Sequence, residues 1–162
     1  SSAHLGMELF LEQAGIKMTH IPYRGVAAAL GDVVAGRIDV GLASIGSAGP
    51  HITGGRVRAL AIVGKSRSPQ FPNVPTFAES GYPDYNNMYW FGFMAPAGTP
   101  SAIVVKLQQD ITKALASPKV KQMFASVGAV PVPMTPADYT ARVKAETATW
   151  RGVSDRAGIK PE

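Results

Sequence analysis

Three short stretches of small residues offer the clearest chemistry in this sequence. Each lies where a helix is expected to begin: Ser1-Ser2-Ala3, Tyr23-Arg24-Gly25-Val26-Ala27 and Ala43-Ser44-Ile45. The first backbone N–H groups of a helix have no partner inside the helix and carry partial positive charge, so they suit carboxylates and phosphates. Any one stretch is equally typical of an ordinary capped helix. Their combination at one edge of a sheet predicts a site for a small anion.

Two neighbouring features leave their roles open. Arg24 could add positive charge to a bound carboxylate, or its stem could simply lie along the surface. Trp90 and Phe91 could form the apolar wall of a cleft, or could belong to the core.

Motifs for catalysis, metals and nucleotides are absent from the sequence. The nearest approach to a nucleophile elbow, Gly41 to Gly46, has the wrong spacing around Ser44, and there is no cysteine. The three histidines show no metal-ligand spacing, and no glycine-rich phosphate loop occurs. We therefore expect no catalytic residue, metal or cofactor. The alternative is a small-molecule enzyme on an α/β scaffold, in which only His4 lies close to a candidate stretch.

The composition further limits the classes of protein to which the chain could belong. The chain has 162 residues, of which 46% are hydrophobic and 17% charged, which favours a folded protein over a disordered one. No apolar run approaches the ~18–20 residues that a membrane span needs. The net charge is +5, but the basic residues are dispersed and no nucleic-acid motif accompanies them. The charge therefore favours small anions over nucleic acid.

The pattern of apolar residues, glycines and prolines predicts alternating strands and helices up to about residue 63. A first helix, capped by Ser1 or Ser2, is expected to run to about Ala14. Further helices are expected over Val26–Ala35 and in a segment that follows Ser44–Gly49 and ends at Gly54, with strands over Lys17–Pro22, Ile38–Leu42 and Val57–Val63. Such βαβ units predict an α/β fold with a parallel-rich sheet covered on both faces. Ser66–Pro83 is expected to be irregular, with at most one helical turn.

The second half reads differently. An extended piece at Trp90–Met94 precedes a helix capped by Thr99, with Pro100 at its first position, which ends near Ala116. Further helices are expected over Pro118–Val127 and Thr135–Ala157, with one short extended piece, Ala129–Pro133, between them. Three helices with apolar stripes need a sheet to pack on. We therefore expect a truncated chain whose missing front supplies that sheet, and self-association of the chain without it.

A series of ordered blocks resembles one known family, the Bug (TctC-like) extracytoplasmic solute receptors of tripartite tricarboxylate transporters. The blocks include His20-Ile21-Pro22-Tyr23-Arg24-Gly25, Gly36-Arg37-Ile38-Asp39-Val40, Gly55-Arg56-Val57-Arg58-Ala59-Leu60-Ala61, Pro72-Asn73-Val74-Pro75-Thr76, Trp90-Phe91-Gly92 and Ala95-Pro96-Ala97-Gly98-Thr99-Pro100. Together they run through essentially the whole chain.

The resemblance implies a periplasmic binding protein of type II-like architecture, which closes on a small carboxylate and delivers it to membrane permease subunits. It implies that residues 1–90 form the ligand-binding second domain, and that residues 91–162 form a crossover strand and helices that return to a largely absent first domain. Many relatives have Asp-Asn where Ala43-Ser44 stands here. The missing acid argues against an amino-acid ligand.

Overall fold

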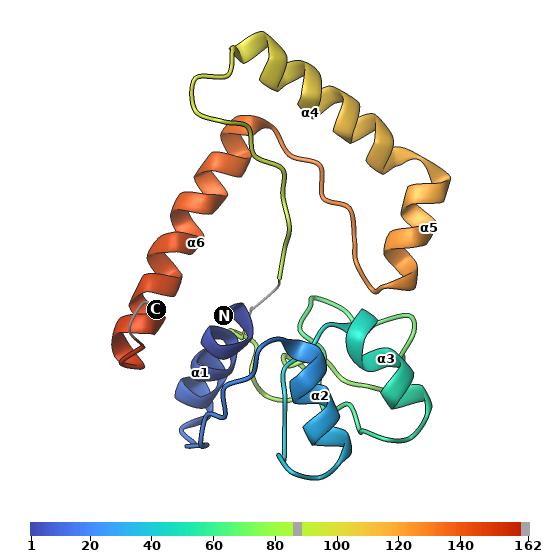
Figure 1. Cartoon of the computed structure of the whole chain (residues 1–162), viewed down its shortest axis with the longest axis vertical. Coiled ribbons are helices and arrows are strands. Elements are labelled where there is room, and N and C mark those ends of the chain that lie inside the picture. Colours follow the sequence, from blue (N-terminus) through green and yellow to red (C-terminus); the bar gives the residue numbers. More distant parts are fainter. Residues whose placement is uncertain (86–88, 160–162) are drawn as a thin grey trace. The chain divides into compact units, whose positions relative to one another are not determined.

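The structure is a computed structural model that describes residues 1–85 and 89–159. The chain divides into two compact units, Ser1–Tyr89 (unit 1) and Trp90–Glu162 (unit 2). Six helices lie in the described residues, three in each unit, and Figure 1 labels them in chain order. Each unit is described by itself below.

Serine caps and a glycine stop explain where two helices of unit 1 begin and end. Helix α1, Ser2–Ala14, begins after Ser1, whose hydroxyl accepts a hydrogen bond from the His4 amide at 3.5 Å. It ends at Gly15, whose φ of 64° is the left-handed conformation that glycine adopts without strain. Helix α3, Ile45–Thr53, begins after Ser44. The stretch 45–49, expected to be a loop, is therefore already helical.

Helix α2, Val26–Val34, begins after Gly25 and is followed by Ala35 and by Gly36 at φ 68°. The expected bounds of α1 and α2 thus agree with the structure to within one residue. Helix α2 contacts α3.

The expected parallel-rich sheet is absent from the described residues. The segments predicted as strands around residues 17–22, 38–42, 57–63 and 129–133 are irregular, and one isolated parallel bridge joins Ile62 to Thr76. At that bridge the Ile62 amide donates to the Pro75 carbonyl at 2.8 Å, and the Phe77 amide donates to the Ile62 carbonyl at 3.1 Å. An apolar segment becomes a strand only where a second segment pairs with its N–H and C=O groups along its length. The predicted strands of unit 1 do not pair with one another in this way.

An aromatic cluster packs around the buried side chain of Tyr85 in unit 1. Phe10 of α1 lies with its ring centroid 5.3 Å from that of Phe77, 5.1 Å from Tyr82 and 5.8 Å from Tyr85. Tyr85 is only 5% exposed, and its hydroxyl donates to the Gly6 carbonyl at 3.1 Å. The tyrosine-rich segment 82–89 therefore packs inward at Tyr85. Residues 86–88 of that segment lie outside the described residues.

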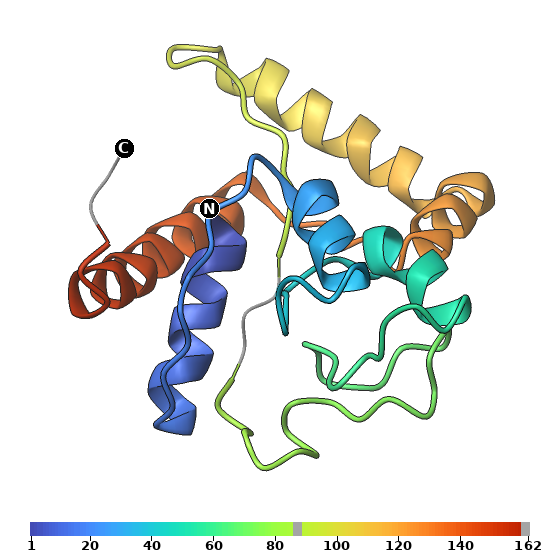
Figure 2. The same ribbon diagram turned by 60° about the horizontal axis from the view of Figure 1, so that its bottom comes forward.

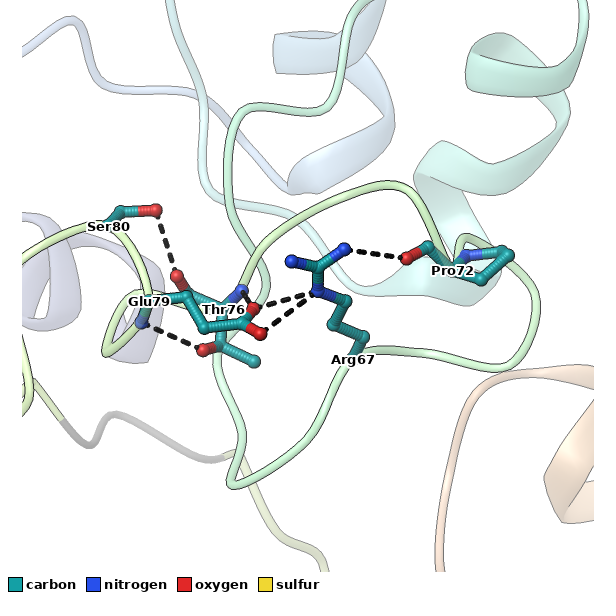
Figure 3. Close-up of polar contacts among 5 residues, drawn as sticks. All are labelled: Arg67, Pro72, Thr76, Glu79 and Ser80. Carbon is teal, nitrogen blue, oxygen red and sulfur yellow. Dashed lines mark hydrogen bonds and ion pairs between the residues drawn. The ribbon is translucent and has the colours of Figure 1, made fainter.

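Arg67 holds the long irregular segment of unit 1 in place (Figure 3). Its Nε donates to both carboxylate oxygens of Glu79, at 3.1 and 2.9 Å, and its Nη1 donates to the Pro72 carbonyl at 3.1 Å. Thr76 and Glu79 bind each other's backbone amides reciprocally, as in the capping box of a helix start. As expected, residues 66–83 contain no helix.

Unit 2 consists of α4 (Ser101–Ala116), α5 (Pro118–Ser126) and α6 (Pro136–Arg156). Helix α4 contacts both α5 and α6. The side chains of Ser117 and Thr135 cap α5 and α6. Thr99 does not cap α4: its hydroxyl donates to the Pro96 carbonyl at 2.8 Å, and Pro100 occupies the cap position.

Trp90 joins the extended segment before α4 to helix α6. Its indole Nε1 donates to one carboxylate oxygen of Glu146 at 2.5 Å, and Arg142 donates to the other at 2.7 Å. The Arg142 guanidinium also lies 5.1 Å from the centre of the indole ring. Burial alone would raise the pKa of Glu146, but the hydrogen bonds from Trp90 and Arg142 outweigh it and hold that pKa below its usual value.

Several large apolar side chains of unit 2 are exposed within that unit. Phe91 is 99% exposed, Phe93 76% and Met94 78%, although Trp90 beside them is packed. The interpretation of Trp90 as a packed residue therefore fits the structure, whereas Phe91 is not part of the core of this unit.

Candidate functional site

The three predicted stretches occupy the starts of the three helices of unit 1. In both views all three helices begin on the upper side of that unit as drawn (Figures 1 and 2). The partly positive ends of three helices therefore face the same side.

The starts of α1 and α3 are capped by serine side chains. The Ser1 hydroxyl takes the His4 amide, and the Ser44 hydroxyl takes the Ser47 amide at 3.3 Å. The hydroxyls of Ser44 and Ser47 also lie 3.0 Å apart, so one donates to the other. Ser1, Ser2 and Ser44 are exposed, and Ala3, Ala43 and Ile45 are half-buried beside them. The serine side chains thus already bind one amide at each of these two helix starts.

The start of α2 differs, because no side chain among the described residues caps it. Gly25 precedes the helix at φ 106° and ψ 160°, a conformation open almost only to glycine. Nothing lies within 4 Å of where a Gly25 side chain would begin. Ala27 is exposed and Val26 half-buried. Of the three helix starts, α2 is therefore the one whose first-turn amides donate no hydrogen bond to a capping side chain in the described residues.

Arg24 is exposed next to this helix start, and no hydrogen bond or ion pair is recorded for it within the part of the chain that the structure describes. Its positive charge is thus available near the α2 amides. That arrangement suits the approach of an anion.

Tyr23, the first residue of the same stretch, points its hydroxyl elsewhere. The hydroxyl donates to Asp32 Oδ2 at 2.7 Å, and Arg37 donates to Asp32 Oδ1 at 2.7 Å. The hydrogen bond to Asp32 raises the pKa of Tyr23, and the hydrogen bonds from Tyr23 and Arg37 lower the pKa of Asp32. Sequence reasoning did not single out Asp32 or Arg37. Their i, i+5 spacing around the end of a helix is too ordinary to mark them.

His4, the histidine nearest a candidate stretch, is engaged with other side chains. Its ring stacks on that of His20 with centroids 3.6 Å apart, and its Nε2 lies 3.4 Å from Glu8 Oε1. Burial and the nearby His4 lower the pKa of His20. These contacts engage the His4 ring in packing within unit 1.

Among the described residues, no group of three His, Cys, Asp or Glu side chains could hold a metal ion. Within the same residues, no helix combines the length and the hydropathy needed to cross a bilayer. The groups present at the three helix starts are backbone amides, serine hydroxyls and, beside α2, the exposed side chain of Arg24.

Comparison with known proteins identifies the family. The model of the tripartite tricarboxylate transporter family receptor, TctC, matches residues 1–159. The chain belongs to this family. Protein BugT of Bordetella pertussis is 40% identical over 160 residues, which are 99% of this chain and 49% of BugT.

Solved structures of similar proteins extend the likeness to three dimensions. Rpa4515 of R. palustris, solved with adipate, has a TM-score of 0.87 at 35% identity, over 100% of this chain and 54% of Rpa4515. The periplasmic binding protein BugD has a TM-score of 0.84 at 30% identity, over 100% of this chain and 55% of BugD. The TctC-family chain therefore shares its fold with these proteins and spans about half of their length.

Proposed function

We propose that this TctC-family chain is the part of a periplasmic solute receptor that binds one carboxylate end of a small organic acid through unit 1. The observation that carries the proposal is the common side on which α1, α2 and α3 begin, with the start of α2 left without a side-chain cap. A carboxylate has about four lone-pair sites and suits several converging N–H donors. The ligand would be handed to the permease subunits of a tripartite tricarboxylate transporter.

Charge supports an anionic ligand over a cationic one. None of the three stretches contains an acidic residue, and Arg24 stands exposed beside the second. The nearest acid in sequence to that stretch, Asp32, is already bound by Tyr23 and Arg37. A ligand ammonium group would find no acidic partner in these stretches, and burying a charge without an opposite charge is costly. We therefore propose a plain carboxylic acid as the ligand and not an amino acid.

Binding to the full-length receptor tests this directly. Adipate, the acid bound in the neighbouring Rpa4515 structure, heads a panel of C4 to C8 dicarboxylates and aromatic acids, measured by isothermal titration calorimetry. For any acid that binds, its neutral diamide and its 2-amino derivative serve as matched controls. We expect the acid to bind and both controls to bind much more weakly.

Two results would contradict the proposal. One is equal affinity for an acid and its diamide, which would mean that the charge is not recognised. The other is no binding by any member of the panel. Recovery of the bound acid unchanged after prolonged incubation separates a receptor from the alternative of an enzyme on the same scaffold.

A further inference from the structure

The carboxylate of Asp32 joins the segment before α2 to the turn after it. Tyr23, two residues ahead of the Gly25 cap, donates to one of its oxygens, and Arg37, beyond the end of the helix, donates to the other, both at 2.7 Å. The Arg37 amide also donates to the Asp32 carbonyl at 2.8 Å. Asp32, which lies inside α2, thus holds both the segment before the helix and the turn after it.

This anchor bears on the α2 amides because little else holds them. Only Arg24 and Gly25 separate Tyr23 from the helix, and no side chain caps the helix start in the described residues. A glycine at φ 106° allows the chain to turn there but does not by itself choose that turn. Fixing Tyr23 through its hydroxyl would therefore limit the directions open to the amides that follow.

We propose that Asp32 is a positioning residue of the carboxylate site: by holding Tyr23 it fixes the amides of Gly25, Val26 and Ala27 in the geometry that receives the ligand. The inference rests on the proposed function of unit 1. It assigns the Tyr23 hydroxyl to this internal bond, so Tyr23 orders the loop and does not donate to the ligand through its hydroxyl.

Arg37 has a second effect in the same arrangement. Asp32 places a negative charge on the helix whose start is to receive an anion, and such a charge would weaken binding. The Arg37–Asp32 ion pair at 2.7 Å compensates for that charge. Loss of Arg37 should therefore lower the affinity for an acid even where the loop stays ordered.

Backbone order at Gly25, Val26 and Ala27 in the ligand-free receptor, measured by ¹⁵N relaxation, provides the first test. Tyr23→Phe and Asp32→Ala should each lower the order parameters of these amides from about 0.85, the value of a rigid backbone, to below about 0.6. In the double variant the order parameters should fall no further, because both changes remove the same Tyr23–Asp32 bond. Asp32→Asn keeps an acceptor for Tyr23 and should restore the order parameters.

Arg67→Gln is the matched control, since it breaks the Arg67–Glu79 ion pair of the same unit, far along the chain from α2. It should leave the order parameters of Gly25, Val26 and Ala27 unchanged. Additive effects of Tyr23→Phe and Asp32→Ala, or equal effects of Asp32→Ala and Arg67→Gln, would overturn the inference.

Adipate affinity of the same variants separates this inference from the proposed function. If adipate binds, Tyr23→Phe should weaken it in the parent chain but not in the Asp32→Ala background, where the Tyr23–Asp32 bond is already lost, and Arg67→Gln should not weaken it. Unchanged adipate affinity in Tyr23→Phe, or an equal effect of Tyr23→Phe with and without Asp32, would overturn the positioning role. If adipate and the other acids of the panel fail to bind, the proposed function fails, whereas the relaxation data still decide whether Asp32 orders the loop.

Discussion

Replacement of Gly25 by alanine should damage the start of α2, whereas the same change at Gly31 should help it. Gly25 has φ 106° and ψ 160°, so an alanine there must either hold a strained backbone or move the loop. Such strain costs about 1–3 kcal/mol. Gly31 lies inside α2 on its exposed side without a positive φ, and alanine favours a helix over glycine by about 0.5–1 kcal/mol.

Contacts cannot account for the difference, because nothing lies within 4 Å of the new methyl group at either position. The two variants should therefore differ by roughly 1.5–4 kcal/mol in the free energy of unfolding, with opposite signs relative to the parent. Urea unfolding followed by circular dichroism measures both. Equal stability of the two variants would refute the assigned conformation of Gly25. Gly25→Ala should also weaken carboxylate binding, and Gly31→Ala should not.

Three further results are expected. The pKa of His20 in the folded chain lies below its ordinary value of 6.5, so below about pH 6.5 the unfolded chain binds more protons than the folded chain, and the free energy of unfolding should fall. This fall should be smaller in His20→Gln, and the same dependence of stability on pH in both proteins would contradict the prediction. Glu146→Gln should lower the free energy of unfolding in urea by about 1 kcal/mol and shift the tryptophan emission, because Trp90 and Arg142 lose a charged acceptor. Unchanged emission would argue against the hydrogen bond from Trp90 to Glu146. In sedimentation velocity the 162-residue chain should self-associate through exposed residues such as Phe91 and Phe93, and Phe91→Ser with Phe93→Ser should reduce it; a single monomeric species of the parent chain would refute this.

Helices were predictable from local chemistry. Ser1, one of the two serines expected to cap the first helix, caps α1, and Gly15 ends that helix with a positive φ. Ser44, Ser117 and Thr135 cap α3, α5 and α6, although α3 was expected to begin later and α6 to include Thr135 itself. These signals act over three or four residues, so the sequence displays them directly. The prediction that Thr99 caps α4 was wrong, because Thr99 and Pro100 are adjacent and the choice between them depends on one turn of backbone that the sequence does not specify.

Strands were not predictable to the same degree, because a strand depends on residues far away in the chain. Ile38–Leu42 and Val57–Val63 have the apolar character of buried strands, yet in the described residues only Ile62 forms a bridge, with Thr76. The spacing of apolar residues indicates which side chains a segment would bury, but not whether a second strand is present to pair with it. Asp32 was missed for a related reason, since its importance comes from Tyr23, nine residues earlier, and not from a motif.

The most direct test of the central claim is a backbone amide NMR titration of the full-length receptor with the tightest-binding acid of the panel. The account predicts that the first-turn amides of α1, α2 and α3 shift downfield together and saturate at the calorimetric stoichiometry, because they take up hydrogen bonds to one carboxylate. It predicts the largest shifts at Val26 and Ala27, the first amides of the helix without a side-chain cap. Saturable binding that leaves all three helix starts unshifted would contradict the claim.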